Sequence, residues 1–74
     1  MGYDYSKLEG RIKEVFGGQS NFAKAMELSE RSVSLKINGI RGWKQPEMIR
    51  ACELLGVEVS EIPDYFFTLK VQRS

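Results

Sequence analysis

The sequence predicts an all-α domain, and three patterns within its 74 residues lead to that fold class. Apolar residues recur at helical spacing over residues 5–16, and two glycines follow them directly. Residues 19–37 fit two short helices joined by a tight turn, which is helix-turn-helix spacing. A third apolar stripe begins after Pro46, a residue suited to the first helical turn, and stops at Gly56. We expect a single domain over residues 1–74.

The first helix is expected from about Tyr5 to Phe16, where one apolar stripe faces the core. The second helix is expected over Gln19 to Met26. Local chemistry favours Ser20 as its N-cap, because a serine hydroxyl accepts from the free amides of the first turn.

The third helix is expected from Ser29, which can cap it, to about Ile37, with Asn38 and Gly39 ending it. At 100° per residue, Val33 and Ile37 share one face, and the stem of Lys36 lies beside them. The opposite face carries polar donors and acceptors together with one leucine, namely Arg31, Ser34, Leu35 and Asn38. A major groove admits a helix with such a surface.

A fourth helix is expected from near Pro46 to Gly56, followed by an extended connector over residues 57–59 and a brief fifth helix from Ser60 to about Phe66. The tail then alternates apolar side chains, which is a strand pattern. A lone strand is unstable, so the tail must lie on this domain or pair with another chain. The side chains that we expect to serve association are Tyr65, Phe67, Leu69 and Val71.

Composition excludes several classes of protein. The chain has no histidine and a single cysteine, Cys52, so it cannot form an internal disulfide and lacks the ligands of a zinc site. It has no phosphate-binding glycine loop and no paired carboxylates on a plausible cleft, so we expect neither an enzyme nor a cofactor. No apolar run is long enough to span a membrane and no leader is recognisable, so we expect a cytoplasmic protein.

The net charge is only +1, but the charges are unevenly distributed. Residues 31–50 carry five bases and one acid, whereas residues 51–69 carry four acids and no base. A domain with one basic end can turn that end toward phosphate. The alternative is an ordinary solvated mixture of charges.

The stretch from Gly18 to Gly39 resembles the lambda-repressor/Cro-like helix-turn-helix family, which includes the small Xre-type regulators of bacteria and phages. Ala23 matches the small residue between the two helices, and Val33 matches the buried aliphatic of the recognition helix. The run Ser-Leu-Lys-Ile-Asn-Gly followed by Arg-Gly-Trp-Lys is similar to small phage-type members. Glu27 departs from the glycine that is frequent at this turn. The resemblance implies a compact five-helix domain and places the cap of the second helix at Gly18.

The resemblance and the position of the third helix assign roles on DNA. Residues at the start of a recognition helix and on its outward face read base edges; these are Glu30, Arg31, Ser32, Ser34 and Leu35. Leu35 has two other interpretations: it contacts a protein partner, or it covers the flank of the second helix. Phosphate contacts fix the register without reading sequence, and we assign them to Gln19, Lys24, Lys36, Asn38, Arg41 and Lys44.

The sequence thus leads to two hypotheses. The first is a DNA-binding transcriptional regulator of a phage or prophage switch, a repressor that binds its double-stranded operator as a homodimer. The alternative is a helix-turn-helix protein that binds another phage repressor and modulates it, which near-neutral charge, the outward Leu35 and the apolar tail favour. Salt separates them, because binding to DNA weakens steeply as salt rises.

Overall fold

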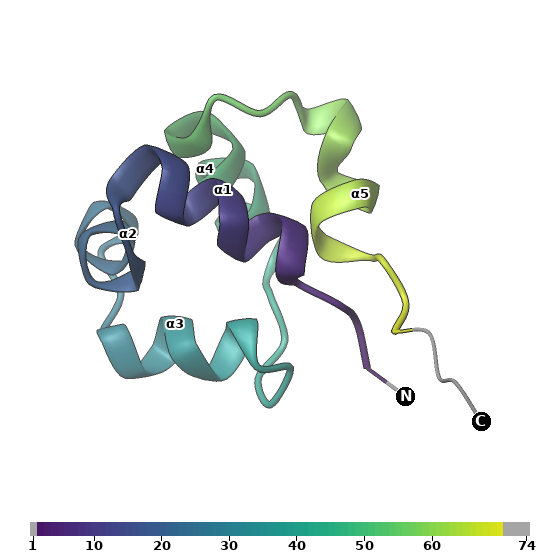
Figure 1. Cartoon of the computed structure of the whole chain (residues 1–74), viewed down its shortest axis with the longest axis horizontal. Coiled ribbons are helices and arrows are strands. Elements are labelled where there is room, and N and C mark those ends of the chain that lie inside the picture. The colour runs from purple at the N-terminus through teal and green to yellow at the C-terminus, as the bar shows by residue number, and fades with distance from the viewer. Residues whose placement is uncertain (1, 71–74) are drawn as a thin grey trace.

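The computed structural model describes residues 2–70, which form five α-helices around one core (Figure 1). The helices are α1 (Ser6–Phe16), α2 (Gln19–Met26), α3 (Glu30–Ile37), α4 (Gln45–Leu55) and α5 (Ile62–Phe66), with a single 3₁₀ turn, η1 (Val59–Glu61), before α5. The predicted all-α, five-helix fold with a helix-turn-helix at α2 and α3 is confirmed.

Helix α1 crosses the centre of the molecule, with α2 and α5 at its two sides (Figure 1). Helix α2 packs against both α1 and α3, so α3 is held at the edge of the fold. The largest side chains without solvent exposure come from four different helices, which makes the core common to the whole domain: Leu8, Ile12, Phe22, Val33 and Leu55. Val15, which the sequence pattern placed on the core stripe, is exposed.

The two ends of α2 are marked by different residues. The N-cap of α2 is Gly18, as the family resemblance implied, and Ser20 lies inside the helix. The C-cap of α2 is Glu27, whose φ of 60° is left-handed, a conformation that glycine adopts without steric cost. Glu27 is the only non-glycine residue with positive φ among residues 2–70.

The tail pairs with the start of the same chain. Tyr3 and Leu69 form an antiparallel bridge, supported by hydrogen bonds from the N–H of Asp4 to the carbonyl of Thr68 (2.6 Å) and from the N–H of Lys70 to the carbonyl of Gly2 (3.2 Å). The two ends of the described chain therefore lie side by side (Figure 1). Of the two arrangements expected for the tail, residues 67–70 adopt the intramolecular one.

Candidate functional site

Helix α3 presents part of its surface to solvent because only one of its faces is apolar. The Ser29 hydroxyl caps the helix by accepting from the N–H of Ser32 (3.0 Å). Val33 and Ile37 are buried, as predicted, whereas Glu30 and Arg31 are exposed at the start of the helix. The side chains of Ser34 and Leu35 are half-buried, so they lie at the surface without projecting far from it.

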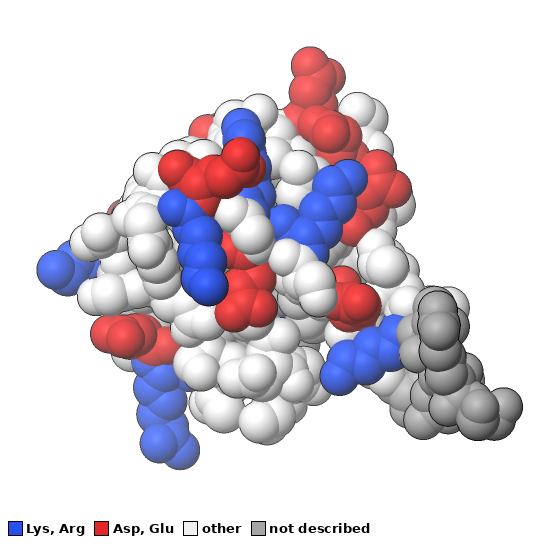
Figure 2. Space-filling model, in the orientation of Figure 1, with Lys and Arg blue, Asp and Glu red and all other residues white. Residues whose placement is uncertain are grey.

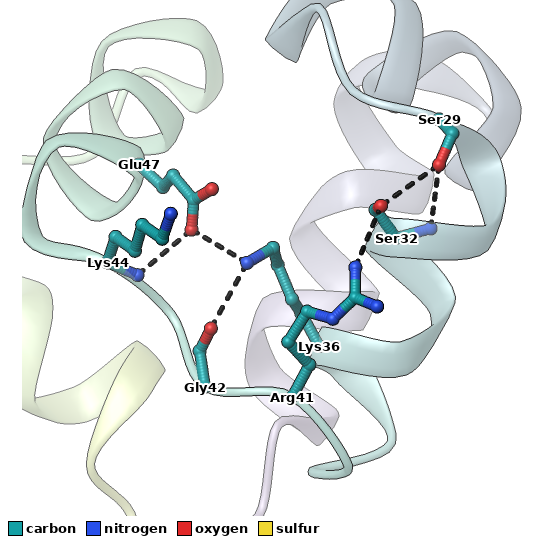
Figure 3. Close-up of polar contacts among 7 residues, drawn as sticks. All are labelled: Ser29, Ser32, Lys36, Arg41, Gly42, Lys44 and Glu47. Carbon is teal, nitrogen blue, oxygen red and sulfur yellow. Dashed lines mark hydrogen bonds and ion pairs between the residues drawn. The ribbon is translucent and has the colours of Figure 1, made fainter.

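Lys36 does not point outward, and the prediction that it binds phosphate is wrong. Its side chain is only 3% exposed, and its Nζ lies 2.9 Å from Oε1 of Glu47 and donates to the carbonyl of Gly42 at 3.1 Å (Figure 3). The ammonium also lies 5.8 Å from the centre of the Trp43 ring. Because its charge is already balanced inside the protein, Lys36 ties α3 to the start of α4 instead of serving a ligand.

Glu47 is the counterpart of this buried ammonium. Burial alone would raise the pKa of the Glu47 carboxyl, but hydrogen bonds from Lys36 and from the backbone N–H of Lys44, together with both lysine charges, outweigh burial and hold its pKa below the ordinary value. Sequence reasoning missed this pairing. Only the capping role of Glu47 had a local signal, since a glutamate three residues after Lys44 is positioned to accept from a free amide at the start of α4.

Four further residues with predicted DNA roles contact one another within the protein, Arg41 with Ser32 and Asn38 with Ser34. Arg41 donates from Nη1 to Oγ of Ser32 at 3.1 Å, and Ser32 also contacts the Ser29 hydroxyl (Figure 3). Nδ2 of Asn38 donates to the carbonyl of Ser34 at 2.9 Å. These contacts order the loop after α3 and occupy part of the hydrogen-bonding capacity that a duplex would need.

The remaining predicted contacts stay untested. Lys24 and Lys44 are exposed, and Gln19 is half-buried at the start of α2. Together with Glu30 and Arg31, they make no side-chain hydrogen bond or ion pair within residues 2–70.

The predicted association residues divide into three groups. Tyr65 is buried in the core beneath the ammonium of Lys7, 4.7 Å from its ring centre, so the expectation that it serves association is wrong. Phe67 and Leu69 are 46% and 61% exposed and remain available. Val71 lies outside the described residues.

An aromatic hollow of about 320 Å³ opens between the N-terminal segment, the loop after α3 and the end of α5. We use this name for the space whose lining includes Tyr3, Tyr5, Arg41, Trp43, Phe66 and Phe67. Trp43 meets Phe66 edge-on with ring centres 5.1 Å apart, and Phe67 meets Tyr3 in the same way at 5.6 Å. The indole Nε1 of Trp43 is buried and has no hydrogen-bond partner within residues 2–70. No pattern in the sequence predicted this hollow.

Charge is separated over the surface. On the face shown in Figure 2, acidic side chains gather where η1 and α5 lie, whereas the loop after α3 carries the exposed cations Arg41 and Lys44. Within the described chain no helix has the length and hydropathy required to cross a bilayer.

The five helices, with α2 and α3 joined by a tight turn, define a small all-α domain of helix-turn-helix type. The chain belongs to the family described as "Protein of unknown function (DUF739)", whose model matches residues 1–69. It is similar to the solution structure of the modulator of repression (MOR) of the temperate bacteriophage TP901-1 from Lactococcus lactis, with 51% identity, a TM-score of 0.81 and 97% of each chain covered. A comparison with curated proteins gave no match.

This similarity corrects the first functional hypothesis. The similar phage protein is a modulator of repression, not a repressor. The prediction that this chain is itself a DNA-binding repressor is therefore contradicted, and the alternative, a protein that modulates another repressor, is favoured.

Proposed function

We propose that this chain binds a repressor protein of the phage or prophage that encodes it and thereby modulates repression. The observation that carries the proposal is 51% identity to a phage modulator of repression over 97% of both chains. At that identity and coverage, the two chains share one fold over nearly their whole length.

Three features of the structure support a protein partner. Lys36, a cation in the last turn of α3, is neutralised inside the fold, and Arg41 and Asn38 donate to serines of α3. The net charge of +1 gives little general attraction to a polyanion. Leu35 offers apolar surface at the centre of the outward face of α3, where a base-reading helix gains more from polar groups.

We assign the exposed part of α3 to the repressor contact, with Arg31 and Leu35 at its centre. Interfaces derive most of their affinity from a few apolar and arginine anchors. Leu35→Ala should therefore weaken repressor binding, whereas Val15→Ala, which shortens an exposed apolar side chain on α1, should leave it unchanged.

The decisive experiment is calorimetry of the purified chain with the repressor encoded in the same phage or prophage, between 50 and 300 mM salt. We expect a complex whose affinity changes modestly over this range. In a gel-shift assay with operator DNA, the chain should alter retention by the repressor and should not retain the operator alone.

Two results would contradict the proposal: the absence of a complex with the repressor, or retention of operator DNA by the chain alone. If the chain bound operator DNA directly, its affinity for that DNA should fall by about a thousandfold or more as salt rises from 50 to 200 mM.

A further inference from the structure

We propose that the aromatic hollow receives an extended segment of the repressor that carries one bulky apolar side chain next to an acidic residue. This inference rests on the function proposed above. It adds a second contact to that of α3, because the loop that lines the hollow follows α3 directly, on the side of the molecule where the two chain ends meet (Figure 1).

The size and lining of the hollow fit an apolar side chain. Its volume of about 320 Å³ lies at the lower end of the range for small-ligand pockets. Tyr3 and Phe67 are 39% and 46% exposed at this site, although a 74-residue domain needs most of its apolar residues for the core. Large aromatic side chains left partly uncovered at a concave site are typical of contacts that a partner completes.

The backbone beside the hollow suits an extended segment. In the bridge between Tyr3 and Leu69, the hydrogen bonds come from the flanking residues, so the N–H and C=O of Tyr3 point away from Leu69. Within residues 2–70 these two groups of Tyr3 make no backbone hydrogen bond. A strand that adds to this edge pairs with both groups and directs alternate side chains toward the hollow, which is a recurrent mode of peptide recognition.

Charge determines which segment fits. Arg41 is the only charged residue that lines the hollow within the described chain. One of its nitrogens donates to Ser32, which leaves further N–H donors of the guanidinium for another acceptor. A carboxylate is the strongest partner for those donors, and a basic segment is repelled.

The test is calorimetry of the full chain against the same repressor, using variants inside and outside the hollow. Phe67→Ala and Arg41→Glu should each weaken binding by about tenfold or more. The matched controls are Val15→Ala, which also truncates an exposed apolar side chain, and Lys13→Glu, which makes the same charge change at the far end of α1. Both controls should bind like the wild type, and thermal melting checks that every variant is folded.

A second measurement locates the contact. Twelve-residue peptides that tile the repressor are titrated into the ¹⁵N-labelled chain, and the amide of Tyr3 and the indole of Trp43 are followed by nuclear magnetic resonance. We expect one acidic-apolar peptide to shift both signals and to protect the Tyr3 amide from hydrogen exchange.

The outcomes separate the two proposals. If the wild type binds the repressor and the hollow variants bind equally well, the hollow is not a repressor site, and the function proposed above stands. If the wild type does not bind the repressor at all, both proposals fail. If the hollow variants change only self-association, measured by sedimentation of the chain alone, the occupant is a second copy and this inference is overturned.

Discussion

At the scale of single residues, Lys36 shows that a residue's position in the sequence pattern can suggest a role that it does not have in the structure. A lysine on a recognition helix is typical of a phosphate contact, yet this one lies inside the protein. The helical projection placed its stem beside Val33 and Ile37. It did not reveal that an acid eleven residues later would receive the amine, because that contact depends on how α3 and α4 pack.

The first prediction concerns this pair. Glu47→Ala should destabilise the domain by about 2–4 kcal/mol, because removing one partner leaves the other charge buried without compensation. Denaturant unfolding measures the loss, and Glu53→Ala, an exposed change on the same helix, serves as the control. The double variant Lys36→Met/Glu47→Leu should recover most of the stability; a double variant as unstable as the single one would contradict this account.

The second prediction concerns pH. The pKa of Glu47 is held below its ordinary value of 4.5, so in acid the unfolded chain binds the proton more readily than the folded one. The stabilisation is complete above about pH 4.5 and is lost as pH falls through the folded pKa. The stability difference between the wild type and Glu47→Gln should therefore narrow below pH 4.5. If the stability difference between the two proteins were constant from pH 7 to pH 3, the pKa of Glu47 would not be lowered by folding.

The third prediction concerns Glu27, which has left-handed backbone at the end of α2. Its carboxylate lies 3.6 Å from Arg50, but both side chains are largely exposed and such pairs contribute little. Glu27→Gly should therefore stabilise the domain by about 0.5–1 kcal/mol. Glu53→Gly, inside α4, should cost about 1 kcal/mol. Thermal unfolding of both variants measures these opposite effects on stability. If the backbone of Glu27 is unstrained, Glu27→Gly should destabilise the domain as Glu53→Gly does.

At the scale of secondary-structure elements, helix ends were predictable where a side chain or a glycine determines them. Ser29 and Gly56 mark boundaries by their own chemistry, and both are caps in the structure. The cap of α2 was predictable only from the family resemblance, since Ser20 is locally the better residue. Residues 57–59 were expected to be extended, but η1 begins at Val59, because Glu61 accepts from the N–H of Glu58 and closes the turn early.

The fourth prediction tests these caps. Ser29→Ala should destabilise the domain by about 1 kcal/mol, because its hydroxyl satisfies a free amide of α3. Ser20→Ala, a change of the same size inside α2, should be neutral or slightly stabilising. Equal effects at the two serines in denaturant unfolding would mean that capping does not explain where α3 begins.

At the scale of the whole molecule, the fifth prediction concerns the C-terminal segment. Phe66 is 2% exposed and Tyr65 also lies in the core, whereas Phe67 and Leu69 project from the surface. Ending the chain after Pro63 should abolish cooperative unfolding, because losing a buried aromatic alone costs about 3–5 kcal/mol. Ending it after Phe66 should preserve cooperative melting. A folded product from the shorter chain would show that α5 is dispensable.

Predictability also differed between the fold and the candidate site. Local periodicity and glycine positions were sufficient for the helices, because each signal acts within a few residues. The site depends on contacts between distant segments: Lys36 with Glu47, Arg41 with Ser32, and the N-terminal residues with the tail. Composition also indicated a protein partner, through the near-neutral charge and Leu35, but the resemblance to repressors outweighed it.

The hydrogen bond between Lys70 and Gly2 has a practical consequence for anyone who studies this protein. Because these two residues lie beside the hollow, a tag or fluorescent protein joined directly to either of them competes for space with whatever docks there. A circular permutant that joins Lys70 to Gly2 by a short glycine linker and opens the chain between α4 and η1 moves the new ends to the opposite region of the domain (Figure 1). Such a permutant is better suited to capture assays. Comparing its partner binding with that of an end-tagged protein reveals how much the tag obstructs the hollow.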